Sequence, residues 1–280
     1  MAEADPASGQ PAHAVIRLPV WGVIAAGLRS VFLYPANLIQ RVWPMVLVTA
    51  GVLALNGVRF IDLEQATGDS LGAALGMVAM ALSALTVAVR WHRGLLTGEP
   101  PPGAGFLRPE MAWLRFVLAF VLMIAGTMIA ASVAIAVMFG VAQAVTGPDR
   151  AYTAIFALAL PVMVAMIAVT GRLVAAYPMI ALGGKTIASL RQSWRLTRGN
   201  TWRLLLMLLI YTVMEWTLFP GAYWLFDRVA DALGTAGFAL AILADAVLAA
   251  LFTALIASIL SYIYAALTGH PAAAELNRQR

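Results

Sequence analysis

Cysteine is absent from this 280-residue chain, and histidine occurs only three times. The absence of cysteine excludes disulfides, thiolate catalysis and cysteine-based metal sites. The three histidines, His13, His92 and His270, are far apart in the sequence and are predicted to lie outside the membrane-spanning segments. We therefore expect no bound metal ion and no cofactor.

Charged residues are also scarce: they make up 11% of the chain, whereas hydrophobic residues make up 62%. Soluble domains contain about 25% charged and about 45–50% apolar residues. A soluble fold of this length has too small an interior for so much apolar surface, so most of that surface is expected to face lipid. The net charge is +5, but no basic stripe with interleaved aromatic residues occurs, and we expect no nucleic-acid partner.

Six apolar stretches are long enough to cross a bilayer as helices, which requires about 20 residues for a hydrocarbon core of about 30 Å. They are predicted at residues 42–57, 70–89, 111–145, 152–183, 203–226 and 236–267. The first is short and is expected to extend toward Phe60, and Pro161 and Pro178 are expected to bend the fourth. The sequence therefore predicts an all-α integral membrane bundle of six transmembrane helices, formed by residues 17–268.

Most of the 18 Lys and Arg residues fall in alternate gaps between these stretches. The basic segments are the N-terminal arm, residues 90–115 and 184–203, and the C-terminal tail. Each intervening gap holds a single arginine with an acidic residue nearby: Arg59, Arg150 and Arg228. Because Lys and Arg are retained on the cytoplasmic side of a bilayer, this alternation predicts a multi-pass protein of the bacterial inner membrane with both termini in the cytoplasm.

The segments that flank the predicted spans have simpler interpretations. Residues 1–16 are expected to form a disordered cytoplasmic arm, and residues 269–280 a cytoplasmic tail. Residues 19–34 are too short to span, and their apolar residues recur at helical spacing: Trp21, Ile24, Leu28, Val31 and Phe32. Arg29 and Ser30 are expected on another face of this helix. The pattern predicts an amphipathic helix lying on the cytoplasmic leaflet.

A second amphipathic helix is predicted within residues 186–203, TIASLRQSWRLTRGNTWR. One narrow arc of this helix is apolar and is formed by Ile187, Leu190 and Trp194. The opposite arc is polar and is formed by Ser189, Gln192 and Ser193. Gly199 suits the left-handed position that ends a helix, and Asn200 suits the N-cap of the next helix. We therefore expect a surface helix half-sunk in the headgroups, followed by a short break before the fifth span.

The densest cationic cluster of the chain lies in the same region and contains no acidic residue: Lys185, Arg191, Arg195, Arg198 and Arg203. These side chains are candidate ligands for anionic lipid headgroups, or for a phosphate-bearing ligand, at the cytoplasmic face. The alternative is that they act only as a topology signal that anchors the loop.

This region also resembles a motif of a known family, carried by Ser189, Trp194, Leu196-Thr197, Gly199-Asn200 and Trp202-Arg203. The pattern is similar to the SW-x-LT-x-GN-x-WR block of bacterial polytopic membrane proteins related to the membrane domain of glycerophosphodiester phosphodiesterases. In the phosphodiesterases the chemistry resides in a separate soluble barrel. Residues 269–280 are too few to form one, so the resemblance implies the membrane module without the enzymatic activity.

Two acidic residues, Glu215 and Asp245, lie within the fifth and sixth predicted spans. Acidic side chains within a bilayer are costly and are candidate functional residues. Two facing carboxyl groups could share a proton and form a proton or cation site. Alternatively, each is a protonated acid that hydrogen-bonds to a neighbouring helix.

No nucleotide-binding, zinc-protease or serine-hydrolase motif occurs in the chain. The sequence predicts a non-enzymatic protein that engages membrane lipids or a membrane protein partner, including another copy of itself, through its Arg-rich cytoplasmic surface. One alternative is a proton- or cation-coupled transporter that uses Glu215 and Asp245. Another is a lipid-modifying enzyme with a polar cluster around His92, Arg93 and Arg191.

Overall fold

The computed structural model describes residues 16–33, 35–58, 71–100, 110–146 and 151–274. Every regular element in these residues is a helix: α1 (Val20–Phe32), α2 (Pro35–Asn56), α4 (Leu71–Thr97), α5 (Met111–Thr146), α6 (Ala151–Leu173), α7 (Ala176–Ala181), α8 (Thr186–Leu196), α9 (Thr201–Leu233), α10 (Thr235–Thr268) and the short 3-10 helix η4 (Pro271–Ala273). Residues 1–15 of the predicted arm and residues 275–280 of the predicted tail lie outside the described residues.

Six helical segments are long and apolar enough to cross a membrane: Pro35–Asn56, Leu71–Thr97, Met111–Val145, Pro161–Ala181, Thr201–Leu233 and Thr235–Thr268. Each of them overlaps one of the predicted stretches. The prediction of an all-α fold with six membrane-spanning helices is therefore confirmed, and the chain has the architecture of a multi-pass membrane protein.

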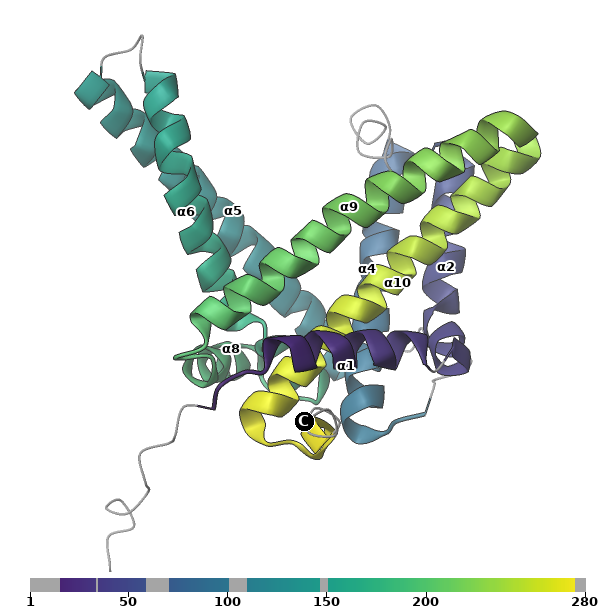
Figure 1. Cartoon of the computed structure of the whole chain (residues 1–280), viewed down its shortest axis with the longest axis horizontal. Helices are drawn as coiled ribbons and strands as arrows, with labels where there is room; N and C mark the ends of the chain where they lie inside the picture. The colour runs from purple at the N-terminus through teal and green to yellow at the C-terminus, as the bar shows by residue number, and fades with distance from the viewer. Residues whose placement is uncertain (1–15, 34, 59–70, 101–109, 147–150, 275–280) are drawn as a thin grey trace, which may run out of the picture.

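The helix ends gather at two opposite ends of the molecule (Figure 1). The helices α1 and α8 and the C-terminal end of α10 lie at one end, and the α9–α10 turn and the tips of α5 and α6 lie at the other. Two basic segments touch at the first end, because Arg115 Nη1 donates to the Gly183 carbonyl (2.9 Å) and Thr186 Oγ1 donates to the Arg115 carbonyl (3.3 Å). We call this end, which holds residues 90–100, 110–115 and 184–203, the basic end.

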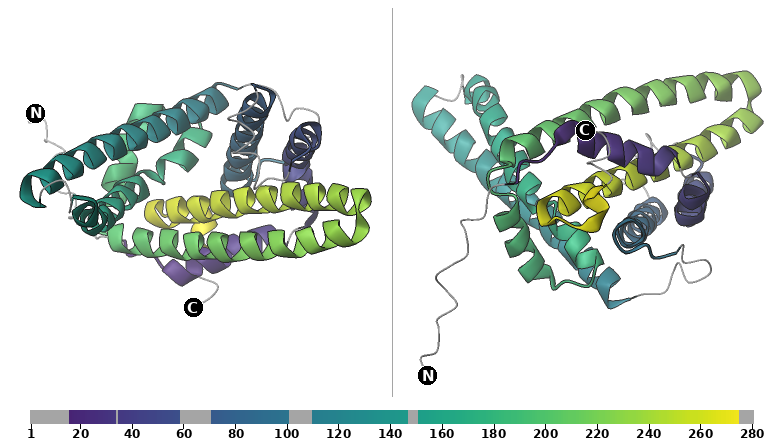
Figure 2. Two further views of the ribbon diagram at one scale, coloured as in Figure 1. Left: turned by 90° about the horizontal axis from the view of Figure 1, so that it is seen from above. Right: turned by 60° about the horizontal axis from the view of Figure 1, so that its bottom comes forward.

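The central helix of the fold is α10. It packs against α9, α2, α1 and α4, and Figure 2 shows it running alongside α9. Its buried face is rich in alanine, with at most 1% exposure at Ala246, Ala250, Ala254, Ala257 and Ala265. Small side chains let neighbouring helix backbones approach closely, which favours helix association inside a membrane. The four neighbouring helices are thus arranged around one Ala-rich helix.

Helix α1 crosses α10 at the basic end and is held by packing and by a hydrogen bond. A Cβ atom at Gly27 would lie 2.9 Å from Ile259 Cγ1, so the two helices touch where Gly27 lacks a side chain. Ser30 Oγ donates to Ser258 Oγ at 2.9 Å. The predicted helix is confirmed, but Val31 of its predicted lipid-facing arc is buried in protein and Ser30 contacts α10. The helix is therefore an integral part of the bundle.

The first membrane-spanning helix differs from its predicted bounds at both ends. It does not extend toward Phe60, because α2 ends at Asn56 and Gly57 follows with a φ of 63°. It begins earlier than predicted, at Pro35. Proline fits the first position of a helix, where its missing N–H would have no intrahelical partner.

The fourth predicted span is divided into two helices. Helix α6 ends at Leu173 and α7 begins at Ala176, whereas Pro161 lies inside α6 without ending it. Pro178 has no N–H to donate to the carbonyl four residues earlier, at Val174. Because this hydrogen bond is missing, the helix breaks between α6 and α7, one turn before Pro178. The bend predicted at Pro178 is therefore present.

The close contact between α1 and α10 predicts a size limit at Gly27. We expect Gly27→Val to push Ile259 aside and to lower the free energy of unfolding by about 1–3 kcal/mol, the usual cost of overpacking. Gly51→Val is the matched control, because a Cβ atom at Gly51 of α2 would meet nothing within 4 Å. Thermal unfolding in detergent measures both variants, and equal melting temperatures would contradict the proposed contact.

Candidate functional site

Helix α8 is fixed to the bundle through its small polar residues. Ser189 and Ser193 are buried, and Ser193 Oγ donates to the carbonyl of Arg172 at 2.8 Å. Thr197 Oγ1, just after the helix, donates to the same carbonyl at 3.0 Å. The carbonyl of Arg172 lies near the end of α6 and has lost part of its helical pairing, so these hydroxyls satisfy it. The polar arc predicted to face away from lipid therefore faces the protein at both serines.

The apolar arc of α8 points outward in part. Ile187 is 60% exposed and Trp194 is 39% exposed, whereas Leu190 packs against a buried cluster formed by α4, α5 and α7. Trp194 is held in place by Arg172, whose guanidinium carbon lies 3.7 Å from the centre of the indole ring and whose Nη2 donates to the Trp194 carbonyl at 2.6 Å. The stacked arginine fixes the direction of the tryptophan, as expected for a cation–π pair.

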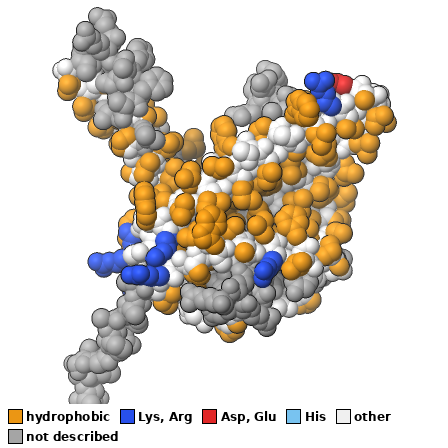
Figure 3. Space-filling view, in the orientation of Figure 1, with side chains coloured by type: hydrophobic (Ala, Val, Ile, Leu, Met, Phe, Trp, Pro, Cys, Tyr) orange, Lys and Arg blue, Asp and Glu red, His pale blue; other side chains and the backbone are white. Residues whose placement is uncertain are grey.

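Four of the five candidate headgroup ligands predicted from the sequence are exposed on this surface: Lys185, Arg191, Arg195 and Arg198. Within the residues that the structure describes, none of the four forms an ion pair. Arg203 is half-buried, and its Nη1 donates to Asn200 Oδ1 at 3.4 Å. Figure 3 shows blue Lys and Arg side chains gathered over α8, next to orange apolar side chains. We call Lys185, Arg191, Arg195, Arg198 and Arg203 the α8 cationic surface.

The break between α8 and α9 also holds the N-terminal segment. Gly199 has a φ of 84°, the left-handed conformation predicted for it, and Asn200 occupies the N-cap position of α9. The Asn200 side chain does not cap α9. Its Oδ1 accepts from the Leu18 N–H (3.0 Å) and its Nδ2 donates to the Ile16 carbonyl (2.7 Å). The α8 cationic surface is therefore tied to the residues that lead into α1.

An ion-pair cluster that the sequence analysis missed also lies at the basic end. Arg90 Nη1 lies 3.2 Å from Glu99 Oε1 and 3.0 Å from Glu110 Oε1. Arg93 Nε lies 3.0 Å from Glu99 Oε2, and Arg93 Nη1 also pairs with Glu110 Oε2. Arg41 of α2 donates to the carbonyls of Arg90 and Glu99. A sequence signal existed, because these two glutamates are the only acidic residues in the basic segment 90–115.

This cluster and the α8 cationic surface have different chemical roles. Glu99 and Glu110 neutralise the charges of Arg90 and Arg93. Arg41 donates its hydrogen bonds to backbone carbonyls. These side chains link α2, the C-terminal end of α4, Glu99 and Glu110. Arg17 and Arg29 are also exposed without an acidic partner among the described residues, but the four exposed cations around α8 form the largest such group, so they are the best placed to bind an external anion.

The ion-pair cluster predicts a dependence of stability on acidic pH. The hydrogen bond from Arg93, assisted by the charge of Arg90, lowers the pKa of Glu110 below its ordinary value of 4.5 although partial burial opposes the shift. A carboxyl with a lowered pKa stabilises the fold above its unfolded-state pKa, and this contribution disappears as the pH falls through the lower folded-state value. We expect the melting temperature in detergent to fall as the pH is lowered below about 4.5.

Glu110→Gln should lower the melting temperature at neutral pH and should reduce its fall in acid, because the variant lacks the titrating carboxyl. Asp231→Asn, which changes an exposed acid near the α9–α10 turn, is the control and should keep the full acid dependence. Identical pH profiles of the melting temperature for the native protein and Glu110→Gln would show that the ion pair between Glu110 and Arg93 does not contribute to stability.

His92 lies near the C-terminal end of α4 and is fully buried in protein, in a helix that continues beyond the predicted span 70–89. Its Nδ1 is 2.7 Å from Ser261 Oγ of α10, and its Nε2 has no hydrogen-bond partner among the described residues. Arg93 is paired with glutamates, and Arg191 is exposed on α8. The three residues of the predicted enzyme cluster are therefore not gathered in one polar site.

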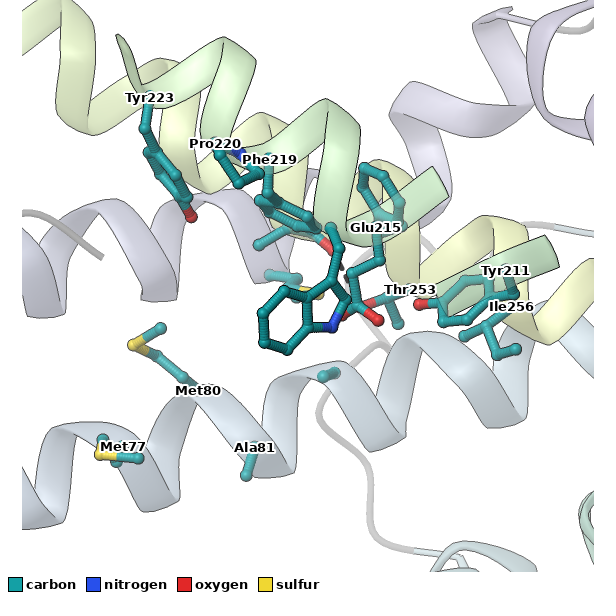
Figure 4. Close-up of a pocket in the computed structure, with 15 residues that line it drawn as sticks. Met77, Met80, Ala81, Tyr211, Glu215, Phe219, Pro220, Tyr223, Thr253 and Ile256 are labelled. Atoms are coloured by element: carbon teal, nitrogen blue, oxygen red, sulfur yellow. Dashed lines mark hydrogen bonds between the residues drawn. The ribbon is translucent and has the colours of Figure 1, made fainter. Parts of the chain in front are cut away.

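The two predicted membrane acids also occupy separate places. Glu215 lines a groove of about 650 Å³ between α4, α9 and α10. Figure 4 shows its side chain near Thr253 and Tyr211. Asp245 is fully buried on α10 and is not among the residues that line this groove. The stretch of α10 from Asp245 to Thr253 is about 12 Å long at ~1.5 Å per residue, so only Glu215 belongs to the groove.

Comparison of the chain with family models, curated proteins and solved structures found no match. The resemblance to the membrane domain of glycerophosphodiester phosphodiesterases therefore stays a prediction. The assignment of function depends on the geometry of the basic end and of the groove.

Proposed function

We propose that the protein is a non-enzymatic module of the bacterial inner membrane that binds anionic lipid headgroups through the α8 cationic surface. The observation that carries this proposal is the exposure of four cations, Lys185, Arg191, Arg195 and Arg198, none of which has an ion-pair partner among the described residues. Cations near an anionic leaflet each contribute on the order of 1 kcal/mol to the attraction.

The surroundings of these cations suit the headgroup region of a bilayer. The exposed Ile187 and Trp194 lie on the same helix as Arg191 and Arg195. A helix at a membrane interface inserts its apolar side chains while its arginines reach the headgroups. Because Ser193 and Trp194 are fixed by bonds to Arg172, the helix presents these groups in one orientation. A preorganised surface loses less conformational entropy when it binds a headgroup.

The proposed orientation follows from the same charges. The basic end is placed in the cytoplasm because Lys and Arg are retained on that side of the bilayer. Both termini are then cytoplasmic, and the α9–α10 turn faces the opposite side. In this orientation the α8 cationic surface meets the anionic lipids of the cytoplasmic leaflet.

Two other functions suggested by the sequence receive less support. The paired-acid version of a transporter needs Glu215 and Asp245 in one polar cavity, and only Glu215 lines the groove. A lipid-modifying enzyme needs reactive polar groups close together near the headgroups, whereas His92 is buried against α10. A protein partner that carries acidic groups could use the α8 cationic surface and is an alternative outcome of the binding test.

The proposal predicts that Arg191→Gln combined with Arg195→Gln weakens binding of phosphatidylglycerol. Loss of two cations worth about 1 kcal/mol each corresponds to roughly 30-fold weaker affinity. Native mass spectrometry of the detergent-solubilised protein, titrated with phosphatidylglycerol and with phosphatidylcholine of the same acyl chains, measures the difference between the two headgroups.

Two single variants, Arg195→Gln and Arg228→Gln, complete the test because each removes one positive charge. Arg228 lies near the α9–α10 turn and should be without effect, whereas Arg195→Gln should weaken binding. Unchanged selectivity for phosphatidylglycerol in the double variant would refute the proposal. A copurifying protein that is lost from the double variant, with lipid selectivity unchanged, would assign the surface to a protein partner instead.

A further inference from the structure

The groove that contains Glu215 has the size and the walls of a small-molecule site. Its volume of about 650 Å³ lies within the range of about 300–1,000 Å³ that ligand pockets occupy. Methionine and aromatic side chains provide most of its lining, namely Met45, Met77, Met80, Tyr211, Trp216, Phe219, Tyr223 and Phe252. Such walls adapt to apolar ligands of different shapes. Trp216 is 76% exposed, so the groove opens on the outer face of the bundle.

Glu215 is the single acidic residue among the groove-lining side chains. Its carboxyl group forms no ion pair or hydrogen bond with the residues that the structure describes, and Figure 4 shows it directed toward Thr253. It lies about 21 Å along α9 from the helix start at Thr201, counting ~1.5 Å per residue. An acidic group at such a position is costly unless it gains a positive partner or a proton. The groove therefore favours positive charge.

The aromatic side chains form a continuous array beside this carboxyl group. Phe219 lies 4.3 Å from Phe252 and 5.7 Å from Tyr223, measured between ring centres, and Tyr211 meets Phe252 edge-on at 6.3 Å. The faces of aromatic rings carry negative potential and attract cations, most strongly where water is excluded. The carboxyl group and the aromatic rings thus both favour a positively charged ligand.

Pro220 adds an acceptor to α9. It lies inside α9 and lines the groove. Because proline has no N–H, the carbonyl of Trp216, four residues earlier, lacks its intrahelical donor. A backbone carbonyl without its donor keeps its negative partial charge, and it lies one residue after Glu215 on the same helix.

From these features we propose that the groove binds a hydrophobic monovalent cation, with Glu215 as its counter-ion. A small hydrated metal ion does not suit the site, because such ions require several oxygen ligands in place of water. A hydrophobic anion would be repelled by the carboxylate, and a neutral ligand would leave it without a partner. The amines of lipid headgroups stay at the bilayer surface, so the ligand is a cation that itself enters the hydrocarbon.

The probe that tests this proposal is tetraphenylphosphonium, with tetraphenylborate as an anion of nearly the same size and shape. Equilibrium dialysis of the native protein in detergent micelles measures binding of each ion, and protein-free micelles correct for partitioning. We expect tetraphenylphosphonium to bind the native protein and tetraphenylborate to show no saturable binding. Equal saturable binding of the two ions would overturn the proposal, because the groove would then be only an apolar surface.

Three variants locate the site and its charge. Glu215→Gln keeps the shape of the side chain and should weaken tetraphenylphosphonium binding about tenfold or more, since an ion pair in a low-dielectric site is lost. Asp231→Asn removes one exposed negative charge outside the groove and should bind as the native protein does. Ala81→Phe fills the groove without changing charge and should also abolish binding, because Ala81 is exposed and lines it.

The binding results for these variants decide the proposal. Unchanged binding in Glu215→Gln, or in Ala81→Phe, would overturn the proposal. If Glu215→Gln fails to melt cooperatively, Ala81→Phe decides, because it keeps the carboxyl group. Arg191→Gln with Arg195→Gln should leave tetraphenylphosphonium binding intact, so failure of the lipid-headgroup function and failure of this site can be distinguished.

Discussion

Close approach of helix backbones to α10 is the constraint on which the rest of the fold depends. Alanines line its buried face, and Gly27 of α1 meets it without a side chain. In lipid the hydrophobic effect does not drive helices together, so van der Waals packing and buried hydrogen bonds must do so. Ser258 and Ser261 supply such bonds on the same helix, accepting from Trp91 Nε1 at 2.6 Å and contacting His92 Nδ1 at 2.7 Å. Small size and polarity thus act together on α10.

The basic end separates two classes of arginine that the sequence does not distinguish. Arg41, Arg90 and Arg93 are used inside the structure, where acids or carbonyls satisfy them. The arginines of α8 are left exposed, and the helix that carries them is held by serine and threonine hydroxyls. Structural bonding on one side of α8 therefore leaves its charges available on the other.

The sequence predicted the number and approximate position of the spanning helices, because hydropathy depends on composition over about 20 residues. It also predicted the Gly199-Asn200 break from local conformational preference. It did not predict that Asn200 binds the chain at residues 16–18, since a side chain's partner across the fold leaves no local signal. Glu99 and Glu110 were missed for the same reason, although their place among arginines was visible.

Glu215 is the only residue of the groove that the sequence identified as a candidate functional residue. Glu215 was identified because a carboxyl group in an apolar stretch is unusual, but its predicted companion, Asp245, is buried elsewhere on α10. The aromatic wall comes from α9 and α10 together, and its residues attract no attention in a chain with many apolar side chains. Their significance depends on which faces of the two helices meet, which only the packing determines.

The anchoring of α1 has a consequence for synthesis of the protein. Ser30 bonds to Ser258, 228 residues later, and Leu18 bonds to Asn200, 182 residues later. At about 5–20 residues per second, a ribosome adds 228 residues in roughly 10–45 seconds. During that interval α1 lacks the surface against which it finally packs. The order of translation and the order of assembly therefore differ, and α1 takes its final place only when α10 has been made.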